Sequence, residues 1–293
     1  MSDEEAKRHK EEYELLLAAF MEFLKNMSTD DEEEKEYALM ELRATLLINH
    51  AYDGFQIDEE DALELLRNTD ERLLSQQEKD KKDRLVAAIE NLIPFAVCEE
   101  YQLTKQTKKV YQAHQMADED YDIDWDNPDE VAEYIDVNEL YNDQYAAVEN
   151  ADVAYAMGIA LWWIGMGSND LITYWTMNDA KVRPWHMALQ GYTASRDEFP
   201  AWMIPPIEWN CRCFLLEAWR ADEVWNKGDL HKVMDKVPSK PKQIKDNTFS
   251  NSVAKCGPIF GSDHNYFKVD KADKTFLDQC VKRIKDKYYG KAD

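Results

Sequence analysis

The sequence predicts an α+β fold, with a mainly helical N-terminal region followed by a small mixed α/β domain. Two observations lead to this prediction. Apolar residues in the first 116 positions recur every three or four residues, which is typical of helices that bury one face. After Gly167 the pattern shortens into β-branched and aromatic runs separated by Pro and Gly, which favours short strands and turns. With 293 residues and 44% apolar content, the chain can bury a sizeable core.

Residues 1–116 contain successive apolar stripes, each predicting one helix: Tyr13 to Leu24, Leu39 to Leu46, Leu63 to Leu74 and Leu85 to Leu92. Acidic residues 30–34 precede the second stripe, where the helix dipole favours negative charge. Asp53-Gly54 predicts a turn, and Pro94 predicts a kink or an end in the last helix. We expect a bundle or a set of long antiparallel helices.

Residues 117–144 are expected to form an acidic linker. Residues 118–143 hold 12 acidic side chains and no basic ones. Alternating aspartates from Asp120 suggest a calcium loop, but its sixth and twelfth positions would be Trp125 and Val131 instead of the required Gly and Glu. A solvated linker or a helix entry is therefore the favoured interpretation.

Residues 145–293 are expected to form the second domain. The Ala-rich apolar run from Tyr145 to Trp163 predicts a buried helix, which Gly165 and Gly167 end. Eight of the nine tryptophans lie between residues 162 and 225, which indicates a packed core there. The other predicted elements are strands from Leu171 to Thr176 and from Cys211 to Trp219, and a helix from Phe276 to Tyr289.

The densest run of special residue types also lies in this domain. It reads Trp175-Thr-Met-Asn-Asp-Ala-Lys-Val-Arg-Pro-Trp-His186, then Gly191, then Pro205-Pro-Ile-Glu-Trp-Asn-Cys-Arg-Cys213. Adjacent prolines fix φ in both residues, and two cysteines at strand spacing point to the same face. We therefore expect this segment to hold one defined local geometry.

His186, Cys211 and Cys213 are candidate ligands of a zinc ion, because thiolate and imidazole are its preferred ligands. Asp179, His231 or His264 would be further candidates. Zinc ribbons and fingers separate their cysteines by two or more residues, whereas one residue separates these. The favoured interpretation is a pair of small buried side chains beside a His186 that hydrogen-bonds backbone, so no cofactor is expected and zinc remains the alternative.

Arg183 and His186 could instead form an acid/base and phosphate clamp of a nuclease. The sequence shows no nearby second histidine, no Asp/Glu pair at metal-ligand spacing, no P-loop and no nucleophile elbow. Arg183 equally suits a buried carboxylate or helix carbonyls. We therefore expect no enzyme and assign no catalytic residue.

The net charge of −24 is unevenly distributed along the chain. Residues 227–293 carry a net charge of +6 and the remainder −30. An acidic body repels phosphate, so residues 227–293 alone could contact DNA, and the favoured interpretation of this segment is a solvated surface of mildly positive charge. No apolar run reaches transmembrane length and the N-terminus is charged, so we expect no membrane contact and a protein made and kept in a cytoplasm.

The run from Trp175 to Cys213 resembles the signature of the phage Mu F-like head-morphogenesis family, which consists of minor head proteins of tailed bacteriophages. Downstream, Phe249-Ser-Asn251, Gly257-Pro-Ile-Phe260 and His264-Asn-Tyr-Phe267 are similar to the closing segment of that family. The resemblance covers roughly Ala151 to Lys268. Members of the family often carry an Arg-Thr-Glu-like element in the helix before the signature. This sequence lacks the element and has Asn150-Ala-Asp-Val153 near that position.

The resemblance implies a minor head protein that acts in procapsid and head morphogenesis near the portal, with a further role in DNA packaging or ejection. It implies portal or major capsid protein as partners, and a place in the head interior after assembly in the host bacterial cytoplasm. The alternative is a phage-delivered effector or a nuclease-like enzyme using Arg183 and His186, although an effector is expected to need a further catalytic domain after His264. The implied structural motif consists of Asp179, Arg183, His186, Gly191, Pro206, Asn210, Cys211, Arg212 and Cys213.

Overall fold

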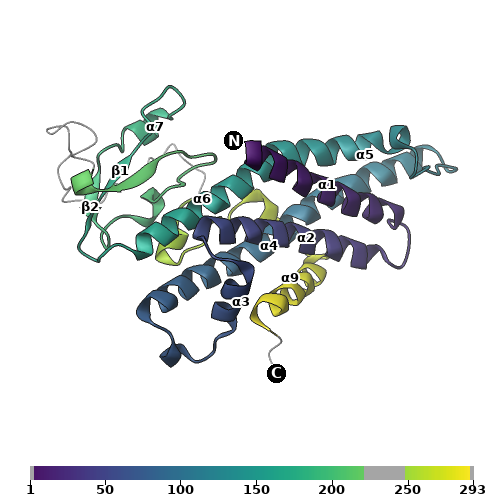
Figure 1. Ribbon diagram of the computed structural model, residues 1–293. Coiled ribbons are helices and arrows are strands. Elements are labelled where there is room, and N and C mark those ends of the chain that lie inside the picture. The colour runs from purple at the N-terminus through teal and green to yellow at the C-terminus, as the bar shows by residue number, and fades with distance from the viewer. Residues whose placement is uncertain (1–2, 221–247, 291–293) are drawn as a thin grey trace. The chain divides into compact units, whose positions relative to one another are not determined.

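A computed structural model describes residues 3–220 and 248–290. Helices dominate these residues and a three-stranded sheet accompanies them, which confirms the predicted α+β class (Figure 1). The helices are α1 Asp3–Lys25, α2 Glu32–Phe55, α3 Glu59–Arg67, α4 Gln76–Ala117, α5 Pro128–Tyr141, α6 Ala147–Ile164, α7 Pro184–Met187 and α9 Lys274–Tyr289. The strands are β1 Leu171–Trp175, β2 Thr193–Ser195 and β3 Phe214–Glu217. Short turns of helix are η1 Glu71–Leu73, η2 Asn142–Ala146, η3 Ala201–Met203, η4 Val253–Lys255 and η5 Asn265–Phe267.

The chain folds into two compact units, each built from separate segments. Unit 1 comprises the described residues of 1–49, 92–150 and 265–293, and unit 2 those of 50–91 and 151–264. Three of the four boundaries fall inside α2, α4 and α6, and the fourth lies directly before η5. The sequence predicts a different division, based on changes in composition along the chain, into residues 1–116, 117–144 and 145–293. That division remains a prediction.

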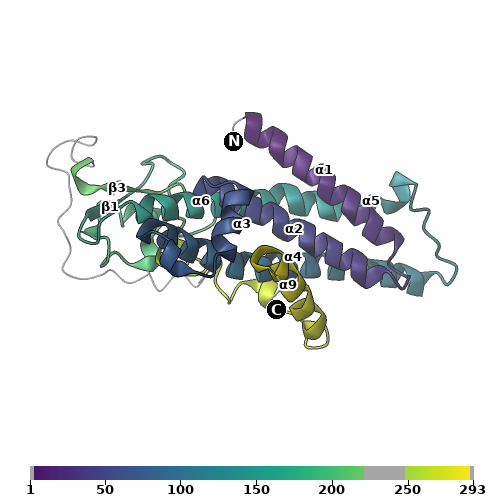
Figure 2. The ribbon, with the colours of Figure 1, turned by 60° about the horizontal axis from the view of Figure 1, so that its bottom comes forward.

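Unit 1 contains an apolar core to which the acidic segment contributes. The α1 stripe, including Phe20 and Phe23, packs with α5, which lies beside α1 (Figure 2). Asn127 caps α5 by accepting a hydrogen bond from the Asp129 amide at 3.1 Å, and the first helical position is a proline. On the inner face of α5, Val131 and Tyr134 are buried. Much of the segment predicted as a linker is therefore helix, because two apolar residues one turn apart give it a face to bury.

One sequence prediction about α2 is wrong, and the helix end that was one of the two outcomes predicted at Pro94 does not occur in α4. Gly54 lies within α2 instead of a turn, and a Cβ added to it would lie 2.0 Å from the backbone oxygen of Ala154. The glycine therefore serves the close approach of two backbones within unit 2. Pro94 lies inside α4 and does not end it, because its neighbours Ile93 and Phe95 are fully buried and hold the helix in place.

Unit 2 contains the sheet, in the order β2-β1-β3, with antiparallel pairing on both sides of β1. The predicted strand from Leu171 is confirmed by β1, whose residues 172–175 are buried. β3 begins at Phe214, so the two motif cysteines precede the strand in which they were expected. Among the described residues, no helix combines the length and apolar character required to cross a bilayer.

Candidate functional site

The short helix α7 positions His186 in unit 2. Arg183 precedes α7 in extended conformation and Pro184 occupies its first turn, where a missing N–H costs nothing. The His186 side chain is 2% exposed. Its ring meets that of Trp185 edge to face, with the centroids 4.1 Å apart. The prolines and aromatics of the motif therefore direct the imidazole inward.

Cys211 and Cys213 meet this imidazole from the other half of the motif. Nδ1 of His186 lies 3.3 Å from Sγ of Cys213 and 3.8 Å from Sγ of Cys211. Both thiols are buried. Asn210, directly before the two cysteines, adopts a left-handed φ of 54°. Its backbone N–H donates to Oδ2 of Asp152 at 2.8 Å. Two segments about 25 residues apart in sequence therefore converge on one point.

Glu208 joins the two halves of the motif, and the sequence reasoning missed it. Its Oε2 lies 3.1 Å from Nε2 of His186 and 3.0 Å from Nε of Arg183. The same oxygen accepts the indole N–H of Trp185 at 3.1 Å. Arg183 also donates to the backbone oxygen of Trp209 at 2.8 Å. The sequence signal that could have identified Glu208 is its position as an acidic residue between the Pro-Pro step and the cysteines.

The remaining motif residues shape the loops around this centre. Arg212 donates to both carboxylate oxygens of Asp179 at 2.8 Å, and this hydrogen bonding lowers the pKa of Asp179 to about 2. Gly191 has a φ of 83° and donates its amide to the backbone oxygen of Tyr174 at 2.8 Å, so the left-handed turn favours glycine there. Pro206 follows a cis peptide bond.

The second set of motif-like residues returns to the same unit. Phe260 stacks on Trp209 with ring centroids 5.3 Å apart, and Phe249 meets Trp209 edge to face. His264 also packs on Trp209, with centroids 5.6 Å apart, and does not join the cysteines. His231 lies outside the described residues. Of the ligands considered from the sequence, the structure therefore brings together His186 and the two cysteines.

Hydrogen bonding between the two thiols separates their acidities. The contact with Cys213, followed by burial, raises the pKa of Cys211. The same contact lowers the pKa of Cys213, and the charges of Arg183 and Arg212 act in the same direction. As the pH rises, Cys213 therefore loses its thiol proton before Cys211 does. Chemically, the centre offers one imidazole nitrogen and two sulfurs that face one another.

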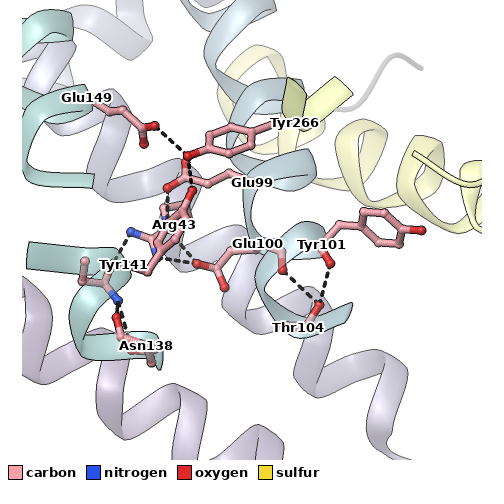
Figure 3. Close-up of polar contacts among 10 residues, drawn as sticks. Arg43, Glu99, Glu100, Tyr101, Thr104, Asn138, Tyr141, Glu149 and Tyr266 are labelled. Atoms are coloured by element: carbon pink, nitrogen blue, oxygen red, sulfur yellow. Dashed lines mark hydrogen bonds and ion pairs between the residues drawn. The ribbon is translucent and has the colours of Figure 1, made fainter. Parts of the chain in front are cut away.

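A second polar cluster, in unit 1, is shown in Figure 3. Arg43 donates from Nε to Glu100 at 2.7 Å and from Nη1 to Asn142 at 2.8 Å. Its Nε lies 3.5 Å from a carboxylate oxygen of Glu99. All four side chains are buried. One guanidinium of α2 is thus enclosed with two carboxyl groups of α4.

Glu149 completes this second cluster. The Tyr266 hydroxyl donates to Glu149 at 2.8 Å, and Tyr141 donates to the hydroxyl of Tyr266 (Figure 3). Burial, and after it the charge of Glu149, raises the pKa of Glu99 well above its usual range. Burial also raises the pKa of Glu149. The charge of Glu149 therefore favours a proton on Glu99.

Comparison with protein families gives one match, to the family described as Phage Mu protein F like protein, over residues 126–216. Comparison with the curated proteins and with the solved structures finds no match. The matched residues begin in the acidic segment and run from just before α5 into β3, so they include the whole motif from Trp175 to Cys213. Residues 126–216 of the chain therefore match the family described as Phage Mu protein F like protein.

Proposed function

We propose that the protein is a minor head protein of a tailed bacteriophage, present in few copies, that acts in procapsid assembly near the portal. A Mu F-like domain is typical of phage head morphogenesis, which implies capsid-related partners and a place in the virion. The observation that carries the proposal is the family match over residues 126–216, which spans both halves of the motif.

The geometry of the motif supports a structural role. Both ring nitrogens of His186 face protein atoms, and the guanidinium of Arg183 contacts Glu208 and a backbone oxygen. A phosphate clamp would require these groups to face a substrate. The motif residues instead hold the loop after β1 against the segment before β3. This arrangement favours a scaffold over the nuclease alternative.

The charge distribution supports the choice of partners. The acidic body suits basic protein surfaces of a portal or of the inner capsid face, and residues 227–293 suit DNA during packaging or ejection. In α9, Arg283 already pairs with Glu34 at 2.9 Å, and Lys287 pairs with Glu41. We therefore assign DNA contact to the other lysines of residues 227–293, some of which lie outside the described residues.

Deletion of the gene from the phage that encodes it tests this function. We expect fewer normal heads and a lower titre, both restored by the wild-type chain supplied from a plasmid. Normal heads and normal titre without the gene would contradict the proposal.

A further inference from the structure

We propose that His186, Cys211 and Cys213 bind one zinc ion, which fastens the two halves of the Mu F-like motif together. The ligand atoms of the three residues all lie within 4.8 Å of one another. The side chains are between 2% and 4% exposed, so the site lies inside unit 2. The three come from two segments, α7 and the residues before β3, so one ion would cross-link them. This inference is independent of the role in head assembly.

The separations of the donor atoms fit a tetrahedral zinc ion. Zinc binds thiolate sulfur at about 2.3 Å and imidazole nitrogen at about 2.0–2.1 Å, so a tetrahedral angle places N and S about 3.6 Å apart. The distances from Nδ1 of His186 are 3.3 Å to Cys213 and 3.8 Å to Cys211, on either side of that value. The one-residue spacing of the cysteines does not prevent this, because both precede β3 and are free of strand geometry.

Glu208 gives this site the outer contact that zinc-binding histidines commonly have. Metal-ligating histidines donate their second ring N–H to a carboxylate or carbonyl, which fixes the tautomer and the ring orientation. Here Nε2 of His186 lies 3.1 Å from Oε2 of Glu208. A proton on Nε2 leaves the lone pair of Nδ1 directed at the two sulfurs. Glu208 is therefore a positioning residue.

Charge balance also fits a buried zinc ion. Zinc binding would release the thiol protons of Cys211 and Cys213 to solvent, and two thiolates neutralise the two charges of the ion. The hydroxyl of Tyr174 is buried without a hydrogen-bond partner among the described residues. A thiolate or a water in the fourth zinc position would give this hydroxyl an acceptor.

Elemental analysis of the purified full-length chain tests the proposal. We expect about one zinc per chain after dialysis, as for a four-coordinate structural site. Cys213→Ser and His186→Ala should lose the zinc. Cys98→Ser and Cys280→Ser, which alter buried thiols elsewhere, should retain it. No zinc in the wild type, even after the reduced protein is incubated with zinc chloride, would overturn the proposal, as would zinc retained by both ligand variants or a Cys211–Cys213 disulfide in the purified protein.

Two further measurements separate ligand loss from misfolding. Cobalt in the wild-type chain should give thiolate charge-transfer absorption and the visible bands of a tetrahedral ion, and Cys211→Ser should weaken the charge-transfer band while circular dichroism stays unchanged. Glu208→Ala should weaken zinc binding by about 10–100-fold in competition with a chromophoric chelator, and Glu208→Gln should restore part of it. Octahedral cobalt spectra, or equal zinc affinity in Glu208→Ala and wild type, would contradict the geometry proposed here.

Discussion

Glu208 holds His186 in one orientation: its Oε2 lies 3.1 Å from Nε2 of the imidazole, while the opposite nitrogen, Nδ1, lies 3.3 Å from Sγ of Cys213. One carboxylate therefore connects the segment before β3 to α7. The same oxygen also meets Arg183 and Trp185. Because three side chains share this acceptor, its removal should affect the whole motif.

Glu208→Ala should lower the free energy of unfolding by about 1–3 kcal/mol, because the buried ring of His186 and the half-buried indole of Trp185 lose their acceptor. Urea unfolding followed by tryptophan fluorescence measures this. The matched control is Glu198→Ala, which removes an exposed acceptor of Ser195 in the same unit. Surface changes of that kind usually stay within about 0.5 kcal/mol. Equal stability of the two variants would show that Glu208 does not connect the motif.

Gly54→Ala should destabilise unit 2, because the added methyl carbon would lie 2.0 Å from the backbone oxygen of Ala154. Overpacking of this kind costs about 1–3 kcal/mol or more. Gly158→Ala is the matched control, since its Cβ would lie 3.4 Å from the backbone oxygen of Gly54, and alanine gains about 1 kcal/mol over glycine within a helix. Thermal unfolding should show a lower Tm for the first variant than for the second. The reverse order would contradict the close backbone approach.

Glu99→Gln should change how stability depends on pH. Burial and Glu149 raise the pKa of Glu99 in the folded state, so the stability that its protonated form contributes is fully present below about pH 4.3, the usual carboxyl value, and is lost as pH rises through the folded-state pKa. The amide of glutamine imitates the protonated carboxyl at every pH. The variant should therefore match the wild type near pH 4 and exceed it at pH 8.

Chemical unfolding at a series of pH values measures that difference. The control Glu119→Gln alters an exposed carboxyl and should keep the stability within about 0.5 kcal/mol of the wild type. A Glu99→Gln variant less stable than the wild type at pH 8 would show that an ionised Glu99 stabilises Arg43.

Neutralising lysines of residues 227–293 should weaken any binding of duplex DNA. Deleting the segment would also remove Tyr266 and α9, which belong to unit 1, so substitutions are the better test. Lys236→Gln with Lys240→Gln and Lys242→Gln should reduce the salt slope of binding by about 0.9 for each phosphate that these lysines no longer neutralise. The control Lys7→Gln with Lys10→Gln alters exposed pairs of α1. An equal weakening of DNA binding in both variants would contradict the assignment to residues 227–293.

Hydrophobic periodicity predicted most of the fold but not its tertiary constraints. The α1 stripe and the β1 pattern are local, and both elements form where expected. Gly54 was misread because a glycine in a helix and a glycine in a turn look alike in sequence, and the deciding contact, with Ala154, is a hundred positions away. Sequence could not decide between a kink and an end at Pro94 for a similar reason, since burial of its neighbours is a tertiary effect.

The two polar clusters differ in how far sequence could reveal them. His186 and the cysteines stand out by residue type, whereas Glu208 is one acid among many and gains meaning from the atoms around it. Arg43 and Glu100 are 57 positions apart and obey no spacing rule. The available hint was Glu99-Glu100 directly after a fully apolar run in a helix, where acidic residues are rare unless they are paired.

The copy number of the chain in purified procapsids tests the central claim most directly. Mass spectrometry with isotope-labelled reference peptides would measure it alongside the portal and major capsid proteins, in procapsids and in mature heads. The proposed role predicts a few copies per particle, far fewer than the major capsid protein and in fixed ratio to the portal. Absence of the chain from both kinds of particle, or a copy number equal to that of the major capsid protein, would contradict it.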